Sequence, residues 1–239
     1  MSVDFTPILA DVQAHAAECA PRECCGLAVV VKGRLRYWPC RNTAGEAEFC
    51  IAPEDYAAAE DAGEIVGVCH SHVFAQPRPS DADRVMCERT AVPWLIVSHP
   101  TGAHHVIEPT GYRLPLVGRQ FSHGVVDCYT LIRDYYDQTL GVVLPDFERP
   151  DKWWLAGADL YRQGFAAAGF EHMGDASAPM RLHDVLLMQV GSPVPNHGAV
   201  LAGDGVILQH CHGRLSSRDV YGGYWRKVTT HVLRHRSLM

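Results

Sequence analysis

The segment Cys69-His70-Ser71-His72, followed seven residues later by Ser80-Asp81-Ala82-Asp83, decides the fold of the first half of this chain. The apolar residues 65–69 predict a buried strand, and the two histidines directly after it emerge on one face because they are two residues apart. A helix is expected to begin at Ser80, with Asp83 in its first turn. Two imidazoles and one carboxylate leave a fourth position open, which is typical of a catalytic zinc site.

Each of these residues also has a simpler structural interpretation. A His-x-His pair alone is weak evidence for a metal, and Glu23 alone is compatible with a surface carboxylate. Ser80 and Asp83 together fit a helix N-cap followed by a first-turn acid that the helix dipole favours. The ordered set is more specific, because Glu23 stands in Pro-Arg-Glu-Cys-Cys-Gly ahead of the two histidines, and Ser80 and Asp83 follow at a fixed spacing.

The remainder of the first half alternates helix and strand patterns. Apolar residues three to four apart predict helices, and β-branched runs bounded by turns predict strands. Lys32-Gly33 marks the turn of a hairpin. The predicted helices span residues 7–19, 53–62 and 80–90, and the predicted strands span 25–31, 35–38, 65–69, 94–97 and 104–107.

A domain boundary is expected in the middle of the chain. Residues 109–119 contain two prolines and two glycines without periodicity, as a linker should. We therefore predict domains at 1–108 and 120–239. The second domain begins with a helix and becomes rich in strands, which indicates an α+β class. Its predicted helices span 127–140 and 155–168, and its predicted strands span 184–190, 197–201 and 206–210.

The composition excludes several classes of protein. The 239 residues carry a formal net charge of −6, so no broad basic surface is expected and nucleic acid is not expected as the main ligand. No apolar run reaches the roughly 20 residues of a membrane-spanning helix, and the first residues lack the pattern of a signal peptide. Synthesis in a cytoplasm follows, with most of the nine cysteines expected to be buried thiols.

A second group of reactive side chains is expected in the second half. Cys128 lies where an apolar run meets an amphipathic helix, and a thiol at a helix N-terminus is expected to have a lowered pKa. His197 opens a predicted strand about seventy residues later. A lone cysteine and a lone histidine are usually structural, so this pair alone does not establish a catalytic site.

The ordered set in the first half resembles the JAMM, or MPN, metalloprotease family over residues 1–108. The motif of that family reads Glu, His-x-His, seven residues, Ser, two residues, Asp, and every position is present. The resemblance implies a mixed sheet with flanking helices and a zinc ion held by His70, His72 and Asp83. It further implies that Glu23 transfers a proton between the attacking water and the leaving amine, and that Ser80 donates to the oxyanion.

The second half resembles the NlpC family of papain-like cysteine peptidases over residues 120–239. The likeness rests on Asp127-Cys128, on His183-Asp184-Val185 and on Asn196-His197-Gly198 followed by Gly203-Asp204-Gly205. It implies a helix packed on an antiparallel sheet, with Cys128 as nucleophile and His197 as general base. A third polar residue would orient the imidazole: Gln209, or His210 if the turn differs by one residue. Phe121 lies near the position where many relatives carry a tyrosine beside the oxyanion.

The two domains in this order, with Gly-Arg-Leu-Ser-Ser-Arg-Asp-Val-Tyr at 213–221, resemble the tail assembly protein K family of lambda-like phages. The resemblance implies a tail-tip protein that is made in the bacterial cytoplasm, joins other tail-tip proteins in the virion and acts at the cell wall or periplasm. Peptidoglycan peptide stems are the implied substrate of the cysteine site. Two alternatives remain, namely a structural assembly factor with vestigial sites, and a deubiquitinase-like enzyme, which the second domain disfavours.

Overall fold

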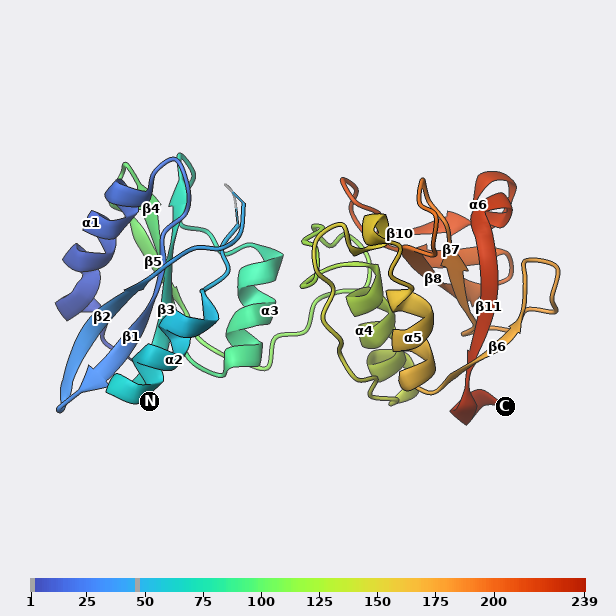
Figure 1. Cartoon of the computed structure of the whole chain (residues 1–239), viewed down its shortest axis with the longest axis horizontal. Helices are drawn as coiled ribbons and strands as arrows, with labels where there is room; N and C mark the ends of the chain where they lie inside the picture. Colours follow the sequence, from blue (N-terminus) through green and yellow to red (C-terminus); the bar gives the residue numbers. More distant parts are fainter. Residues whose placement is uncertain (1–2, 46–47) are drawn as a thin grey trace. The chain divides into compact units, whose positions relative to one another are not determined.

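The computed structural model describes residues 3–45 and 48–239 of the chain (Figure 1). Its internal contacts divide the chain into two compact units, Met1–Arg113 and Leu114–Met239, which are called the first and second units below. The division falls inside the segment 109–119 that the sequence predicts to be a linker. The boundaries 1–108 and 120–239 themselves stay a prediction.

The first unit is built on a five-stranded mixed sheet in the order β2-β1-β3-β4-β5. Strands β3 and β4 are parallel, and the other neighbours are antiparallel. Because β4 must return to run parallel to β3, a helix crosses over between them. The strands are β1 (Cys25–Val31), β2 (Arg34–Cys40), β3 (Glu64–Val73), β4 (Trp94–His99) and β5 (His104–Ile107).

Helices cover both faces of this sheet (Figure 1). Helix α1 (Leu9–Cys19), which follows a short 3-10 turn at Thr6–Ile8, packs on one face, and α2 (Pro53–Ala62) and α3 (Asp81–Thr90) lie on the other. The strands therefore alternate between two apolar layers. In β3, Cys69 belongs to the layer under α1, whereas Val68 belongs to the opposite layer.

Strand β3 is longer than the sequence predicts. The predicted strand ends at Cys69, whereas β3 continues to Val73, so both histidines lie within the strand. The reason is the parallel partner: β4 extends to His99, and its register pairs His70 with Ile96 and His72 with Ser98. The expectation that the histidines follow the strand end is therefore wrong, although both still share one face.

The second unit packs helices against a six-stranded sheet in the order β10-β9-β8-β7-β11-β6, with all described neighbours antiparallel. Side chains of α4 (Cys128–Leu140) and α5 (Leu160–Ala167) form the core on one face. Residues of α6 (Gly223–Val228) pack on the other face. The strands are β6 (Phe170–Gly174), β7 (Val185–Met188), β8 (His197–Gly203), β9 (Val206–Gln209), β10 (Ser217–Val220) and β11 (Thr229–His235), and 3-10 turns occupy Trp153–Ala156 and Arg236–Leu238.

Both units have the predicted α+β class, but four elements of the second unit were not predicted. These are β6, β10, β11 and α6, which mix polar with apolar residues. All nine cysteines are free thiols, and six of them are buried, as the sequence predicts for most. Among the described residues, no helix is long and apolar enough to cross a membrane.

Candidate functional site

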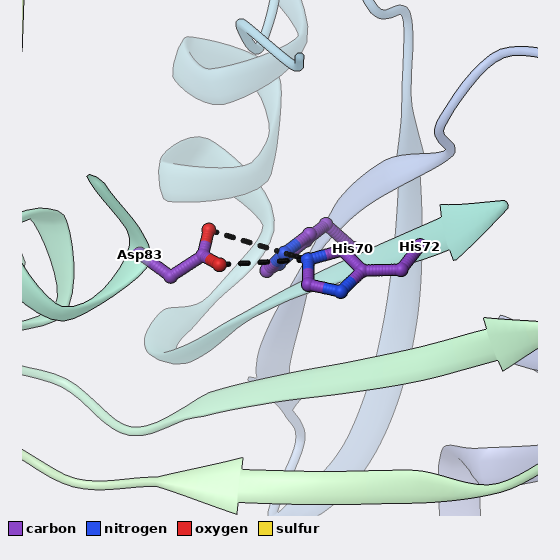
Figure 2. Close-up of side chains that lie close together, drawn as sticks. All are labelled: His70, His72 and Asp83. Atoms are coloured by element: carbon purple, nitrogen blue, oxygen red, sulfur yellow. Dashed lines mark hydrogen bonds and ion pairs between the residues drawn. The ribbon is translucent and has the colours of Figure 1, made fainter. Parts of the chain in front are cut away.

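In the first unit, β3 and α3 bring His70, His72 and Asp83 together (Figure 2). The Nε2 atoms of the two histidines lie 3.2 Å apart. Asp83 presents Oδ1 at 3.3 Å from Nε2 of His70 and Oδ2 at 3.4 Å from Nε2 of His72. Three ligand atoms of the predicted metal site therefore converge on one point.

These separations fit a zinc ion. A tetrahedron with metal–ligand bonds of roughly 2.0–2.1 Å has edges of about 3.3 Å, which matches the three distances. Nδ1 of His72 lies 3.0 Å from the carbonyl oxygen of Gln76. Donation of the Nδ1 proton to that carbonyl leaves the Nε2 lone pair facing the other ligands, as in metal-binding histidines generally. The residues present therefore suit the metal that the sequence predicts.

Ser80 and Asp83 also form the N-terminal cap of α3. The Ser80 hydroxyl oxygen accepts from the Asp83 amide at 3.1 Å, and the Ser80 amide donates to Oδ2 of Asp83 at 2.7 Å. The structural interpretation of this pair is thus confirmed, and it coexists with the ligand geometry. Burial acts to raise the pKa of Asp83, but the contacts with His70 and His72 outweigh it and hold that pKa well below its usual range.

Aromatic packing, which the sequence does not predict, fixes the position of the His70 ring. The His70 side chain is fully buried, and the Phe49 ring stacks on it with centroids 4.6 Å apart and planes 24° apart. The edge of Trp94 approaches the same imidazole at 5.6 Å. Burial lowers the pKa of His70, so the neutral, ligand-competent form is favoured.

Glu23 lies just ahead of β1 and is half-buried. Burial raises the pKa of its carboxyl to about 7; the His72 charge lowers it, and Asp83 and Glu48 raise it further. A carboxyl group that interacts with both His72 and Asp83 is positioned beside the predicted metal site. A pKa near neutrality suits a group that both takes and returns a proton.

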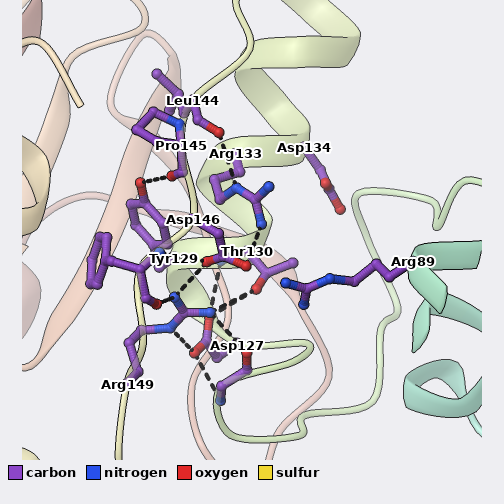
Figure 3. A network of polar contacts seen from close by, with 12 residues as sticks. Arg89, Asp127, Tyr129, Thr130, Arg133, Asp134, Leu144, Pro145, Asp146 and Arg149 are labelled. Atoms are coloured by element: carbon purple, nitrogen blue, oxygen red, sulfur yellow. Dashed lines mark hydrogen bonds and ion pairs between the residues drawn. The ribbon is translucent and has the colours of Figure 1, made fainter. Parts of the chain in front are cut away.

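In the second unit, Cys128 lies at the N-terminus of a helix, as the sequence predicts; it is the first residue of α4, and Asp127, where the predicted helix begins, is the N-cap. Asp127 caps the helix by accepting from the Thr130 amide at 2.9 Å. The Asp127 carboxylate in turn accepts from Nε of Arg149 at 2.6 Å in an almost fully buried ion pair (Figure 3). The helix start that carries the thiol is therefore held by a charge network.

The predicted lowering of the Cys128 pKa is wrong. Burial raises the pKa of this thiol to about 11, and the Asp127 charge adds to the rise. Hydrogen bonds from Tyr161 and from the backbone amide of Gly198 act in the opposite direction but are weaker. The rule for helix N-termini assumes a solvated thiol, whereas this side chain is only 4% exposed.

His197 contacts Gln209 and not His210. Nε2 of His197 lies 2.9 Å from Oε1 of Gln209, and Nε2 of Gln209 donates to Oδ2 of Asp219 at 2.5 Å. His210 is fully buried beside Phe121, with ring centroids 5.1 Å apart, and neither of its ring nitrogens has a hydrogen-bond partner in the described part of the chain. Of the two alternatives that the sequence left open, Gln209 is the one that contacts His197, and its role in orienting the imidazole stays a prediction.

Three residues near these side chains were not predicted. The Tyr161 hydroxyl lies 3.0 Å from Sγ of Cys128, and Cys211 Sγ lies 3.7 Å from Nε2 of His197. Asp219 contacts Gln209 as described. Cys128 lies against the Gly198 amide, next to His197 in the chain. Predicting the contacts of Tyr161 and Asp219 requires knowledge of how α5 packs and of the register of β10. No local sequence pattern indicates either of these.

Comparison with known proteins agrees with this architecture. Residues 6–109 match the family described as prokaryotic homologs of the JAB domain, and residues 118–234 match the NlpC/P60 family. The tail tip assembly protein K of Escherichia phage N15 is 40% identical over 232 residues, which cover 95% of this chain and 93% of that protein. The chain belongs to the tail tip assembly protein K family. The family member of Escherichia phage lambda is 41% identical over 187 residues, which cover 78% of this chain and 90% of the relative.

Solved structures also match parts of this tail tip assembly protein K family member. A JAB1/MPN domain protein from Archaeoglobus fulgidus is 19% identical, with a TM-score of 0.31, and the match covers 45% of this chain and 88% of that one. A protein from Desulfitobacterium hafniense is 27% identical, with a TM-score of 0.33, over 42% of this chain and 77% of that one. The predicted family and domain order are confirmed by the sequence matches.

Proposed function

We propose that this protein is a virion-associated tail-tip protein with two peptide-bond hydrolase sites, one in each unit. The metal site comprises His70, His72 and Asp83, and the thiol site is centred on Cys128. The names of the phage N15 and lambda relatives support the tail-tip location and other tail proteins as partners. The two matched domain families support the hydrolase chemistry.

In the first unit, the proposed reaction is cleavage of a peptide or isopeptide bond in a tail protein. His70, His72 and Asp83 would hold the zinc ion, which would supply Lewis-acid chemistry at the carbonyl group of the substrate. Glu23 would accept a proton from the attacking water at its carboxylate and return that proton to the leaving amine; its half-buried carboxyl interacts with His72 and Asp83, which places it beside the metal ligands. The Ser80 hydroxyl oxygen accepts from the Asp83 amide, so the hydroxyl hydrogen stays available for an oxyanion.

In the second unit, the proposed reaction is cysteine-dependent hydrolysis of a peptide bond. His197 takes the Cys128 proton, the sulfur attacks the carbonyl carbon, and the C–N bond breaks as the imidazolium protonates the leaving amine. Water then hydrolyses the thioester. Burial raises the pKa of this thiol and favours its neutral form, so the mechanism needs a base such as His197 to take the proton. The 2.9 Å contact between His197 and Gln209 is the observation that carries this proposal.

The proposed substrate of the thiol site is the peptide stem of peptidoglycan, cut when the phage genome enters the cell. A chain of net charge −6 has no general attraction to an anionic cell wall. Attachment to the tail would therefore supply the local concentration that free diffusion does not.

Purified full-length protein and muropeptides with intact stems test this proposal. We expect shortened stems from the wild-type chain and none from Cys128→Ala, because a methyl group cannot replace the nucleophile. His70→Ala should keep the muropeptide activity and serves as the matched control, since it alters only the other unit. Intact stems with the wild-type protein would contradict the peptidase proposal.

A structural assembly factor is the second candidate, and the burial of Cys128 favours it. A phage that carries Cys128→Ala distinguishes the two. Complete particles that adsorb but deliver DNA poorly support the enzyme, whereas missing or malformed tails support the assembly role. If the variant phage infects at wild-type efficiency and the wild-type protein leaves muropeptides intact, Cys128 has neither role in infection.

A further inference from the structure

The side chain of Gln209 faces two different partners. Its Oε1 lies 2.9 Å from Nε2 of His197, and its Nε2 lies 2.5 Å from Oδ2 of Asp219. An amide can present either its oxygen or its nitrogen to a neighbour, and only the surrounding hydrogen bonds decide which one. The orientation of the Gln209 amide is therefore set by a partner that can accept a hydrogen bond but cannot donate one.

Asp219 is that partner. An ionised carboxylate has no hydrogen to donate, so it selects the NH2 group of Gln209 and turns the amide oxygen toward His197. The β9–β10 register pairs Ser217 with Gln209, which places Asp219 two residues along the same face of β10. The Ser217 hydroxyl donates to Oδ2 of Asp219 at 3.2 Å, and an Arg214 nitrogen lies 4.0 Å from Oδ1. These contacts hold the carboxylate in place.

We propose that Asp219 is a positioning residue that fixes the tautomer of His197 through Gln209, an inference that rests on the proposed function of the thiol site. The amide oxygen accepts only from a protonated Nε2, so the hydrogen of neutral His197 lies on Nε2 and the Nδ1 lone pair is free to take the Cys128 proton. A reversed amide would offer its NH2 group to Nε2 and place the hydrogen on Nδ1. That tautomer cannot accept a proton from Cys128.

The other neighbours of His197 do not make this selection. Cys211 Sγ is 3.7 Å from Nε2 of His197 and 3.7 Å from Oε1 of Gln209, and a thiol is both a weak donor and a weak acceptor. Trp225 packs its ring 6.0 Å from the imidazole, centroid to centroid. The direction of the two hydrogen bonds that link Asp219, Gln209 and His197 is therefore set by the Asp219 carboxylate.

The test uses full-length protein and two measurements: the 15N shifts of the His197 ring, and the rate and pH profile of Cys128 alkylation by iodoacetamide. In Asp219→Asn the new amide can accept or donate, so we expect a mixture of His197 tautomers and alkylation at neutral pH slower by about tenfold, as expected for loss of one charge-assisted hydrogen bond. Asp204→Asn, on the exposed turn between β8 and β9, removes one carboxylate from the same unit and should change neither measurement.

A double variant separates positioning from simple stability. In Gln209→Glu with Asp219→Asn, the carboxylate at position 209 accepts from His197 by itself, so the Nε2–H tautomer and most of the alkylation rate should return. Asp219→Glu keeps an acceptor-only group and should also preserve the tautomer if Asp219→Asn fails to fold. A single Nε2–H tautomer with an unchanged pH profile in Asp219→Asn would overturn the proposal. Wild-type protein that cuts no muropeptide would refute the proposed function, while the 15N shifts would still decide the role of Asp219.

Discussion

The hydroxyl oxygen of Tyr161 lies 3.0 Å from Sγ of Cys128, and both side chains are buried in the core of the second unit. This hydrogen bond lowers the pKa of the thiol, against the larger effect of burial that raises it to about 11. Tyr161 comes from α5, whereas the thiol opens α4. The packing of α5 against α4 therefore affects the pKa of the Cys128 thiol.

Tyr161→Phe is expected to slow the alkylation of Cys128 by about fivefold at neutral pH, because loss of a hydrogen bond of about 1 kcal/mol raises the thiol pKa further. The rate is followed by mass spectrometry across a pH series. Tyr135→Phe is the matched control, since it removes a hydroxyl that contacts His183 at 2.8 Å instead. Equal rates in wild type and Tyr161→Phe would show that the phenol does not affect the thiol.

Wild-type protein is expected to bind about one zinc ion per chain, and Asp83→Asn should lose most of it. Ser80 stays the N-cap, and the amide oxygen of asparagine can still accept from the Ser80 amide, so this variant removes the ligand charge while keeping the start of α3. Elemental analysis after dialysis measures the metal. His105→Ala removes an exposed histidine from β5 and should retain full zinc. Full occupancy in a His70→Ala, His72→Ala double variant would refute the site.

Chelation should lower the melting temperature of the first unit, because an ion that binds only the folded state stabilises it by mass action. The shift should vanish in the Asp83→Asn variant. A melting temperature that does not change when wild-type protein is stripped of metal would mean that the ligands do not bind zinc at the concentration used. Calorimetry with and without added zinc makes the comparison.

Arg149→Met is expected to destabilise the second unit by about 3–5 kcal/mol, because it leaves the buried carboxylate of Asp127 without its partner. The two side chains of this pair are 1% and 2% exposed. Hydrogen exchange of the buried α4 amides measures the loss. The control is Arg162→Met, where the pair with Asp159 is 56% exposed on the arginine side and should contribute less than about 1 kcal/mol.

The second unit should lose stability as pH falls from about 6.5 toward 4 because of His210. Burial, and next the charge of Arg119, lower the pKa of this histidine from 6.5 to about 4, so the unfolded chain binds a proton that the folded chain does not. The stability that the neutral, buried His210 contributes to the folded state is fully present above about pH 6.5. His210→Leu should flatten this part of the stability profile in urea titrations, and a slope equal to that of wild type would contradict the assignment.

The sequence predicts that His70, His72 and Asp83 lie close together, because the position of each one depends on local geometry. Two histidines two residues apart share a face of any strand, and Ser80 with Asp83 forms a cap wherever a helix starts. The extension of β3 was missed because it depends on pairing with β4, which lies about twenty residues further along. Strand length is set by the partner as much as by the strand itself.

The thiol site was less predictable because its surroundings come from distant segments. Asp127 before Cys128 indicates a helix start, but no pattern near Cys128 indicates how deeply the sulfur is buried, and that burial reverses the expected pKa shift. The choice between Gln209 and His210 needed the register of β9, since adjacent residues point to opposite faces. Asp219 lies on a strand, β10, that the sequence did not predict.

The hydrogen bonds between Ser80 and Asp83 have a consequence for how the protein matures in an infected cell. Both bonds lie within the chain itself, so the start of α3 and the position of Asp83 are expected to be set when the first unit folds. Zinc is then expected to load last, into a prepared site, and folding would not wait for the metal supply of the host. Newly made copies could join growing tails during zinc starvation and acquire the ion later.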